Sequence, residues 1–389
     1  MMYKHWQTQL NLLQEQDSYR SLKHVEPLGG PWVNFEGQRM LNLSSNDYLG
    51  IAHDPQHLRN FYTQITEDSL FDQFGLSATS SRLLTGNHPA YQELERTLCY
   101  HYQKSGALMF NSGYHANLGI LPALIGKGDL ILSDKLNHAS IIDGARLCDA
   151  DLLRYKHLNY EHLRSFLEKN RSKYRQVIII TETIFSMDGD VADLQQLCAL
   201  KEEFDCLLYI DEAHAIGTRG EHGLGICEEQ NVIDSVDIIS CPLGKGMASI
   251  GCFTMMDEVL QEYLINKMRP LIFTTALPPI NIAWTQYVFG EILRSKAKRD
   301  HLKDLSVHSQ KSLSDSGFKV ESESNILPLI LGENELTVRT AKALQDGGFL
   351  VFPIRPPSVP KGSSRLRISL TADIRKEDLT SFIDILQKS

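Results

Sequence analysis

Residues 176–214 read QVIIITETIFSMDGDVADLQQLCALKEEFDCLLYIDEAH. The stretch holds two short apolar runs, Gln176–Thr181 and Cys206–Ile210, and between them the segment Leu194–Phe204. Short apolar runs bounded by polar residues are typical of buried parallel strands, and the intervening segment has the length and spacing of a helix. The stretch therefore predicts a strand–helix–strand unit of a parallel sheet.

The same alternation continues on both sides of this stretch. Further apolar runs lie at Ala107–Phe110, Leu130–Leu132 and Val236–Ser240, and helical spacing is found at Tyr91–Tyr102, Tyr114–Leu124 and Tyr160–Lys169. Strands that alternate with helices over this length indicate an α/β domain with a mostly parallel sheet.

The two ends of the chain have a different pattern. Tyr3–Asp17 predicts a helix, and Trp32–Phe35 and Met40–Leu43 predict extended segments. After Pro278 and Pro279, a smaller α+β domain is predicted from a mostly helical stretch, three strand-like segments and a last helix: Ile280–Ser316, Ile326–Leu331, Phe349–Phe352, Arg365–Leu370 and Lys376–Gln387. We expect an N-terminal segment at 1–45, a large domain at 46–279 and a small domain at 280–389.

Composition excludes several classes of protein. The 389 residues carry a net charge of −9 and no basic stripe, which argues against a nucleic-acid partner. The seven cysteines form no C-x-x-C pair, so no zinc ribbon is predicted, and an odd count suits a reducing cytoplasm. No apolar stretch reaches membrane-spanning length and the N-terminus lacks an apolar signal region. We expect a cytoplasmic protein without a metal site or a membrane partner.

Polar residues follow the predicted strands, where ligands of α/β proteins bind. The run at 107–110 leads into Asn111-Ser112-Gly113-Tyr114 directly before a helix, an arrangement that suits an anion, although a plain strand-to-helix turn has the same pattern. The run at 130–132 leads to His138, and the run at 176–181 leads to Asp188-Gly189, a common turn. Each of these features is weak evidence by itself.

Asp211 directly follows the run Cys206–Ile210 and begins the tetrapeptide Asp211–His214. A carboxylate at the end of a buried strand is costly unless it is paired, and a protonated pyridine nitrogen is a suitable partner. A cationic pyridine ring is the electron sink of pyridoxal phosphate, whose phenolic oxygen His214 could reach. The tetrapeptide also spells the DEAH box of helicase-type NTPases. Neither Gly126-Lys127 nor Gly244-Lys245 forms the phosphate-binding loop that such enzymes need.

Lys245 lies between two glycines after the run Val236–Ser240, and small neighbours let a bulky group approach its amine. This suits a Schiff-base lysine, while a surface turn is the alternative; the carboxylate one strand earlier favours the functional interpretation. In the smaller domain, Arg365 and Arg367 are spaced to share one face of a strand. An arginine fork is the usual clamp for a carboxylate, and a solvated edge strand is the alternative.

Together these features resemble the α-oxoamine synthases of the fold-type-I pyridoxal-phosphate superfamily. The likeness runs from Ser45–Gly50 to the C-terminal strand and is carried by Leu136–Ser140, Phe185–Asp190, Asp211–His214, Gly244–Gly246 and Ile354–Pro360. The last stretch is the most typical of the branch that serves biotin biosynthesis.

The resemblance implies a role for each matching residue. Lys245 would hold the cofactor as a Schiff base and move a proton, Asp211 would pair with the pyridine nitrogen, and His138 would stack on the ring. The other cofactor contacts would come from Ser112, Gly113, Tyr114, Ser186, His214, Thr274 and Thr275, the last two reaching the phosphate of a neighbouring subunit. The substrates would contact Arg367, at the amino-acid carboxylate, and Arg20, Asn46, Arg355 and Ser358, on the acyl side.

The resemblance also implies an activity: decarboxylative condensation of L-alanine with a pimeloyl thioester, carried by coenzyme A or an acyl carrier protein, in a homodimer. Two alternatives remain. One is a sister α-oxoamine synthase that uses glycine or serine with another acyl thioester, and the other is a catalytically weak partner subunit.

The chain departs from the family pattern at three places. Pro242 stands where a hydroxyl residue usually contacts the phosphate, so Ser240 or Cys241 would have to replace that contact, or it is lost. The stretch Gly75–Ser81 is altered, and Met247–Ser249 lacks a glycine often found there. These changes are expected to weaken cofactor binding or to reshape the acyl pocket.

Overall fold

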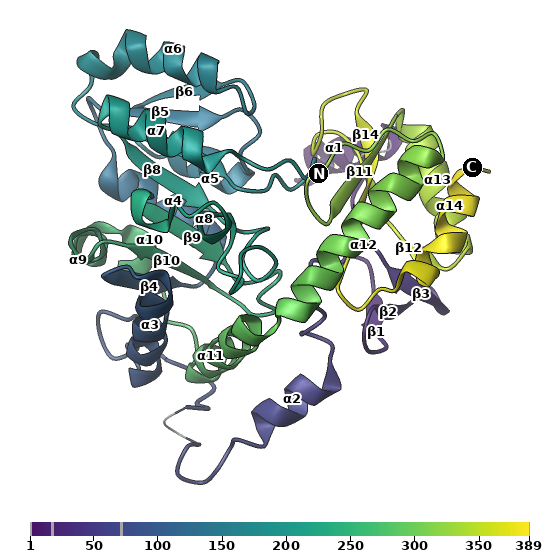
Figure 1. Cartoon of the computed structure of the whole chain (residues 1–389), viewed down its shortest axis with the longest axis horizontal. Helices are drawn as coiled ribbons and strands as arrows, with labels where there is room; N and C mark the ends of the chain where they lie inside the picture. Colours follow the sequence, from purple (N-terminus) through teal and green to yellow (C-terminus); the bar gives the residue numbers. More distant parts are fainter. Residues whose placement is uncertain (1, 17–18, 71–72, 389) are drawn as a thin grey trace. The chain divides into compact units, whose positions relative to one another are not determined.

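The computed structural model describes residues 2–16, 19–70 and 73–388, which form two compact units (Figure 1). The large unit comprises residues 46–186 and 190–300, and the small unit comprises 1–45, 187–189 and 301–389. The expected boundaries lay at 45 and 279. The unit boundary at 300 lies later because α11 (Pro279–Arg294) contacts α3 (Pro89–Tyr102) and buries one face in the large unit.

The large unit is built on a seven-stranded sheet of order β4-β10-β9-β8-β7-β5-β6. Every neighbouring pair is parallel except those of β10, which is antiparallel to both β4 and β9. This confirms the mostly parallel α/β class. The strands are β4 (Gly106–Phe110), β5 (Leu130–Asp134), β6 (Asp151–Tyr155), β7 (Val177–Glu182), β8 (Leu207–Asp211), β9 (Ile238–Pro242) and β10 (Cys252–Met256).

Helices connect most of the strands of the large unit. Side chains of α4, α5, α9 and α10 pack in one apolar cluster with side chains from the sheet. Several of these helices begin at a residue whose side chain accepts a hydrogen bond from the first turn, as Ser112 and Asp193 do. Besides α3 and α11, the helices are α2 (Pro55–Tyr62), α4 (Gly113–Leu124), α5 (Ala139–Arg146), α6 (Tyr160–Asn170), α7 (Leu194–Phe204), α8 (Ile226–Glu229), α9 (Glu258–Lys267) and α10 (Arg269–Ile272).

The small unit combines both ends of the chain. Its four-stranded sheet has the order β1-β2-β3-β12, and its three-stranded sheet has the order β11-β14-β13. β12 pairs in parallel with β3, so that Leu41 lies opposite Phe349. The strands are β1 (Val25–Pro27), β2 (Trp32–Phe35), β3 (Gln38–Asn42), β11 (Ile326–Gly332), β12 (Phe349–Leu350), β13 (Pro353–Ile354) and β14 (Ser364–Ser369).

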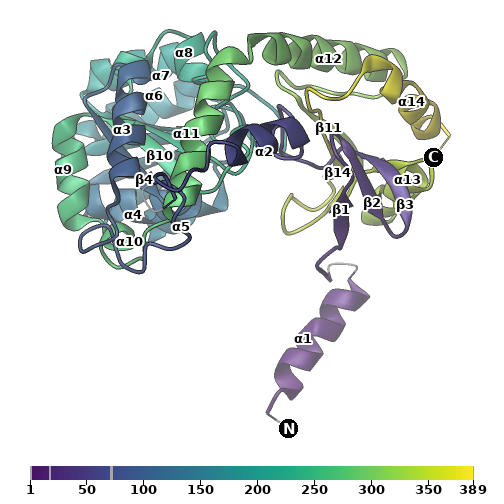
Figure 2. The same cartoon turned by 90° about the horizontal axis from the view of Figure 1, so that it is seen from below.

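The helices of the small unit differ in how they are packed. The first helix, α1 (Lys4–Glu15), has no buried residue and stands apart from β1–β3 in Figure 2. The others are α12 (Lys296–Asp315), which contains the unit boundary, α13 (Asn334–Asp346) and α14 (Thr380–Leu386). The predicted end of the first helix, Asp17, lies outside the described residues.

Five strands differ from what the sequence pattern predicts: the short strands β1 and β13 have no predicted counterpart, and the others are β6, β10 and β14. β6 is an edge strand with charged residues at Asp151 and Arg154, so it lacks an apolar run. β10 follows β9 without a helix between them, and strand–helix alternation therefore does not predict it. β14 lies in the middle of its sheet, which corrects the edge-strand alternative for Arg365 and Arg367.

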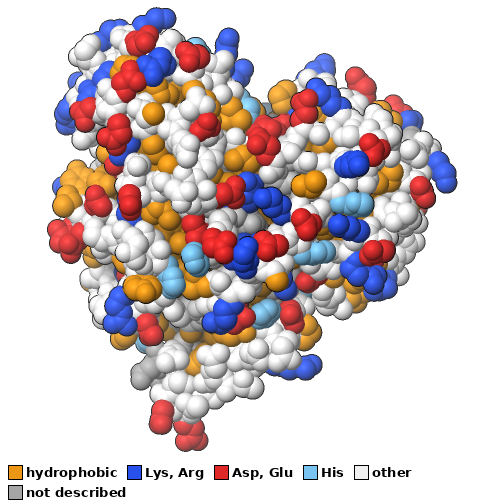
Figure 3. Space-filling model, in the orientation of Figure 1, with side chains coloured by type: hydrophobic (Ala, Val, Ile, Leu, Met, Phe, Trp, Pro, Cys, Tyr) orange, Lys and Arg blue, Asp and Glu red, His pale blue; other side chains and the backbone are white. Residues whose placement is uncertain are grey.

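On the face drawn in Figure 3, acidic and basic side chains of the described residues are interspersed. Among the helices formed by these residues, none combines the length and the apolar composition needed to cross a membrane.

Candidate active site

The residues predicted to bind a cofactor in the large unit follow strands that end at one edge of the sheet. Because β4, β5, β7, β8 and β9 run in the same direction, their carboxyl ends share that edge. The segments after these strands carry, in chain order, Ser112–Tyr114, His138, Ser186, Asp211–His214 and Lys245.

Asp211 is the last residue of β8 and is only 4% exposed. Its Oδ1 accepts a hydrogen bond from the Ala213 amide at 2.9 Å, and its Oδ2 accepts one from Asn117 Nδ2 at 2.9 Å. The Tyr209 hydroxyl donates to Asn117 Oδ1 at 2.5 Å and so turns the amide nitrogen toward Asp211. The same nitrogen donates to Ser140 Oγ at 3.0 Å. Asn117, which the sequence did not single out, therefore fixes the carboxylate.

His138 begins α5, and its Nδ1 lies 2.8 Å from Ser140 Oγ. Partial burial of the ring lowers the pKa of His138; the negative charge of Asp211 opposes this shift, and the positive charge of Lys245 adds to it. A histidine that is neutral at neutral pH suits stacking on a cationic ring, because it adds no like charge.

Glu182 is a second residue that the sequence did not single out. It ends β7 opposite Asp211 of β8 and accepts a hydrogen bond from the His138 amide at 2.6 Å. Burial, followed by the charge of Asp211, raises the pKa of Glu182 to about 8, while Lys245 opposes the shift. A glutamate directly after the buried run Val177–Thr181 was the available signal, since such a charge needs a partner.

The turn that carries Lys245 follows β9 and is held by backbone hydrogen bonds. The Ala248 amide donates to the Lys245 carbonyl at 2.8 Å, and the Ser249 amide donates to the Leu243 carbonyl at 3.0 Å. A Cβ at Gly246 would lie 2.6 Å from the Ile216 carbonyl oxygen, so only glycine fits there. Ala248, in the segment that lacks the family's glycine, has a φ of 45°, a conformation that costs an L-residue about 1–2 kcal/mol.

Pro242 packs against the start of α4. A Cβ at Gly113 would lie 2.5 Å from Pro242 Cγ, so glycine is required for this contact. Ser112 accepts the His115 amide at 3.1 Å, and the other amides of a first helical turn have no partner within the helix, which suits an anion. Ser240 and Cys241, the proposed replacements for the hydroxyl, are buried and contact Cys252 and Tyr102 respectively.

Two further sets of predicted residues lie in the large unit. His214 Nδ1 is 2.6 Å from the hydroxyl of Tyr48, which donates to Asn46 Oδ1 at 3.1 Å. This arrangement brings together one residue expected at the cofactor and one expected at the acyl substrate. The carbonyl of Thr275 accepts a hydrogen bond from Asn111 Nδ2 at 2.8 Å, so the segment of Thr274 and Thr275 is attached to the end of β4.

The remaining predicted residues lie in the small unit. Arg20 Nη2 donates to Ser358 Oγ at 2.9 Å, and the Ser358 amide donates to the Arg355 carbonyl at 3.1 Å. Arg20 and Arg355 also line a pocket of about 510 Å³ together with Lys23 and Lys342.

The two arginines of β14 have different contacts. Arg367 Nη1 donates to Ser369 Oγ at 2.6 Å, whereas Arg365 is buried and forms an ion pair with Asp188 at 2.5 Å. Arg365 therefore binds a carboxylate of the protein itself, that of Asp188.

Glu212, the second letter of the DEAH sequence, is fully buried. Its carboxylate accepts the amides of Ile226 and Cys227 at the start of α8, at 3.1 and 2.7 Å, and the Thr183 hydroxyl at 2.8 Å. Glu212 thus holds α8 in place, and this structural role accounts for the resemblance to an NTPase motif.

Known proteins match the whole length of the chain. The family model "Aminotransferase class I and II" matches residues 38–386. The 8-amino-7-oxononanoate synthase of Chlorobaculum parvum is 45% identical over 96% of this chain and 96% of its own length. That of Haemophilus ducreyi is 47% identical over 94% of this chain and 96% of its own length.

Solved structures match the same fold. A serine palmitoyltransferase from Sphingomonas wittichii has a TM-score of 0.90 and 29% identity, covering 100% of this chain and 96% of its own. An 8-amino-7-oxononanoate synthase from Francisella tularensis has a TM-score of 0.75 and 26% identity, covering 90% of this chain and 97% of its own. The chain belongs to the class I and II aminotransferase family, and its relatives there include the 8-amino-7-oxononanoate synthases.

Proposed function

We propose that the chain condenses L-alanine with a pimeloyl thioester to give 8-amino-7-oxononanoate, CO₂ and the free carrier. The observation that carries the proposal is the 45–47% identity to two 8-amino-7-oxononanoate synthases over at least 94% of the chain. The family makes the chain a pyridoxal-phosphate enzyme that transfers an acyl group.

The residues at the carboxyl edge of the sheet fit this cofactor. Asp211 is a buried carboxylate that two hydrogen-bond donors hold in place, and a carboxylate oxygen can accept a further hydrogen bond from a pyridine N–H. The α4 N-terminus provides backbone amides for a phosphate, and Ser112 at its start accepts the His115 amide. When bound, pyridoxal phosphate supplies the electron sink that makes the α-carbon of an amino acid acidic.

Each protein group then has a defined task in the proposed reaction. The Lys245 amine holds the cofactor and moves the proton at the substrate α-carbon. Asp211 would keep a proton on the pyridine nitrogen, and His138 would contact the ring. Arg367 binds the carboxylate of alanine. Asn46 and the cluster of Arg20, Arg355 and Ser358 bind the acyl substrate.

The pocket in the small unit suits an anionic part of the acyl substrate. Its lining includes the cations Arg20, Lys23, Lys342 and Arg355 and one acid, Glu36, and Lys342 is ion-paired with Asp346 at 2.7 Å, so three cations face one acid. Such an excess of positive charge favours a carboxylate or a phosphate. Coenzyme A and an acyl carrier protein are both anionic, so either carrier is compatible with this pocket.

We further propose that the chain acts as a homodimer. Large apolar side chains are exposed on the large unit: Leu76, Leu84 and Phe273 by 78, 78 and 72%, and Ile250 by 50%. Their segments are joined, since the Ala276 amide donates to the Ser80 carbonyl at 2.9 Å and a Cβ at Gly251 would lie 2.9 Å from Leu277 Cδ1. An exposed apolar patch of this kind is typical of a protein interface.

The first test is the visible absorption spectrum of the purified protein before and after borohydride. The wild type is expected to be yellow and to be trapped by borohydride on Lys245, whereas Lys245→Ala retains no covalent cofactor. Lys267→Ala, on an exposed residue of α9, is the matched control and should behave as wild type. A protein that stays colourless after addition of pyridoxal phosphate would favour the weak partner subunit, for which Pro242 is the supporting feature.

An amino-acid panel tests the substrate. The serine palmitoyltransferases that match with a TM-score of 0.90 are the reason to include serine and glycine beside alanine. We expect CO₂ release and product only with alanine and a pimeloyl thioester. Turnover of serine or glycine with another acyl thioester would replace the proposal by the sister activity.

A further inference from the structure

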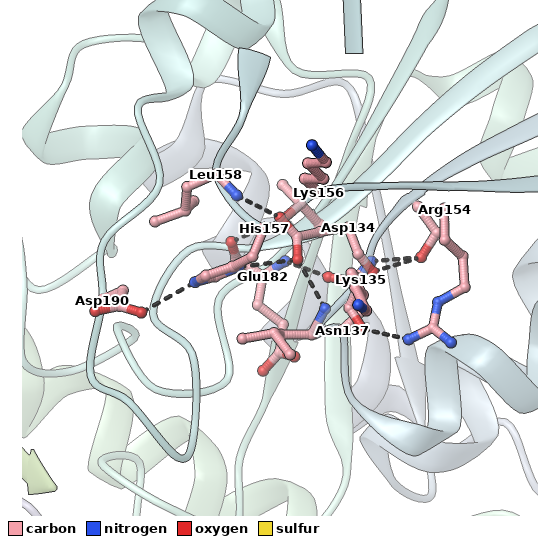
Figure 4. Close-up of polar contacts among 12 residues, drawn as sticks. Asp134, Lys135, Asn137, Arg154, Lys156, His157, Leu158, Glu182 and Asp190 are labelled. Carbon is pink, nitrogen blue, oxygen red and sulfur yellow. Dashed lines mark hydrogen bonds and ion pairs between the residues drawn. The ribbon is translucent and has the colours of Figure 1, made fainter. Parts of the chain in front are cut away.

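His157 lies just after β6 and contacts two carboxylates through its two ring nitrogens (Figure 4). Nδ1 is 3.0 Å from Asp134 Oδ1, and Nε2 is 3.0 Å from Asp190 Oδ2. Carboxylates only accept hydrogen bonds, so both ring nitrogens must donate, and only the imidazolium form can do so. The side chain of His157 is 22% exposed and that of Asp134 is fully buried.

Asp134 organises the loop that ends at His138. Besides His157, its carboxylate accepts the amides of Leu136 at 2.8 Å and Leu158 at 2.9 Å. Asn137, the residue before His138 in this loop, donates from its side-chain amide to the Ile180 carbonyl of β7 at 2.8 Å. The backbone that presents His138 is therefore fixed from Asp134 onward.

Asp190 closes the base of the loop that carries Ser186. The Phe185 amide donates to the Asp190 carbonyl at 3.1 Å, and Ile184 forms a β-bridge with Val191. The ring of Phe185 meets the ring of His157 edge to face, with 4.4 Å between the ring centres. His157 therefore contacts both segments at the base of this loop: it pairs with the carboxylate of Asp190 and packs against the ring of Phe185.

The charges around His157 favour its protonated form. Burial alone would lower the pKa of His157, but the hydrogen bonds to Asp134 and Asp190 outweigh it and raise the pKa to about 9. The other ionisable groups on the adjoining segments are the cations Lys135, Arg154 and Lys156, the acids Glu161, Glu182, Asp188 and Asp193, the phenols Tyr155 and Tyr160, and the histidines His138 and His162. The side chain of Arg154 donates to the Lys135 carbonyl, and the ring of His162 accepts a hydrogen bond from the Lys156 amide. These two side chains therefore bond to the backbone.

We propose that His157 is a positioning residue: as an imidazolium it joins the His138 loop to the Ser186 loop and so sets both side chains for the cofactor. The loop contacts stand on the geometry alone. The statement that the two loops serve a cofactor rests on the proposed function.

The first experiment measures the protonation of His157 in the protein without cofactor, by NMR of labelled histidine side chains. Comparison with His157→Gln identifies the signal, which is expected to titrate near pH 9 in the wild type. Asp190→Asn removes one of the two carboxylates and should lower that pKa. His222→Gln, which removes a histidine paired with Glu228 at 2.6 Å elsewhere in the large unit, should leave the signal unchanged. A His157 signal that titrates near 6.5 would overturn the proposal.

The same pairing predicts how stability depends on pH. Because the pKa of His157 is raised on folding, its contribution is fully present below about pH 6.5 and is lost as the pH rises through about 9. The difference in melting temperature between wild type and His157→Gln should therefore be largest near pH 6 and shrink by pH 9. A constant difference would mean that the ring acts only by packing.

The second experiment measures cofactor binding by titration with pyridoxal phosphate at pH 7. Loss of a doubly charge-assisted contact is expected to weaken binding roughly tenfold in His157→Gln and in Asp190→Asn, with no further loss in the double variant. Unchanged affinity in both single variants would overturn the positioning role. If His157→Gln does not fold, the histidine signal whose titration shifts in Asp190→Asn identifies His157, and Asp190→Asn then provides both readouts. If Lys245 is not trapped by borohydride, the proposed function fails while the NMR result stands.

Discussion

Asn117 makes one amide serve three neighbours: it accepts from Tyr209 and donates to Asp211 and Ser140. Asn117→Leu would leave the Tyr209 hydroxyl and one Asp211 oxygen buried without this partner. An unsatisfied buried group costs about 1–3 kcal/mol, so the free energy of unfolding should fall by roughly that amount.

The same substitution should raise the dissociation constant for pyridoxal phosphate about tenfold, because the carboxylate is no longer oriented. Urea unfolding and a spectral titration measure the two effects. Asn266→Ala, which removes an exposed amide on α9, is the matched control. Normal cofactor affinity in Asn117→Leu would show that Asp211 needs no such support.

For single residues, the sequence can reveal a charged residue at the end of a strand, but it does not reveal which residues that charge contacts. Asp211 and Lys245 could be singled out because each follows an apolar run, where a charge needs a reason. Asn117 and His157 could not, since their partners are distant in the chain and come near only when α4 packs on the sheet and the strands pair. Whether the singled-out residues act on a cofactor stays a prediction.

At the scale of the elements, an ion pair with Arg82 attaches the segment before α3 to that helix, and a further hydrogen bond attaches α3 to β4. Arg82 contacts Glu95 of α3 through both terminal nitrogens, at 2.6 and 3.0 Å, and Glu95 also accepts the Met109 amide of β4 at 2.9 Å. Their side chains are only 12 and 11% exposed. Arg82→Ala is therefore expected to lower the free energy of unfolding by about 3 kcal/mol, because it leaves a nearly buried carboxylate without its cation.

Chemical denaturation of Arg82→Ala measures this loss. The matched control is Arg294→Ala, whose pair with Glu291 has an arginine side chain that is 70% exposed, and the expected change is below about 1 kcal/mol. Equal effects in the two variants would refute the argument from burial.

Elements with a simple pattern were predicted well and those without it were missed. The apolar runs at 107–110, 130–132, 176–181 and 206–210 overlap β4, β5, β7 and β8, the last two beginning one residue early, and Leu194–Phe204 is α7. β6 has no apolar run because edge strands tolerate charge, whereas β10 is an apolar run that was missed because no helix separates it from β9. The spacing of apolar residues indicates which side chains of one segment are buried. It does not indicate which other strand will pair with that segment.

For the molecule as a whole, the exposed apolar side chains of the large unit predict self-association. Phe273→Asp places a charge on the proposed interface and is expected to shift the protein from dimer to monomer in sedimentation. Val259→Asp changes an apolar side chain that is 77% exposed on α9 and should leave the dimer intact. A wild type that sediments as a monomer, or a Phe273→Asp variant that remains dimeric, would contradict the proposed interface.

The pairing of β3 with β12 also has a consequence during synthesis of the protein. Leu41 emerges early from the ribosome, whereas its partner Phe349 emerges near the end. At about 5–20 residues per second, the N-terminal strands wait roughly 15–60 s for that partner, while the whole of the large unit is already available to fold. The small unit is thus completed last, so a nascent chain truncated before residue 349 should contain a protease-resistant large unit and N-terminal strands that remain open to cleavage.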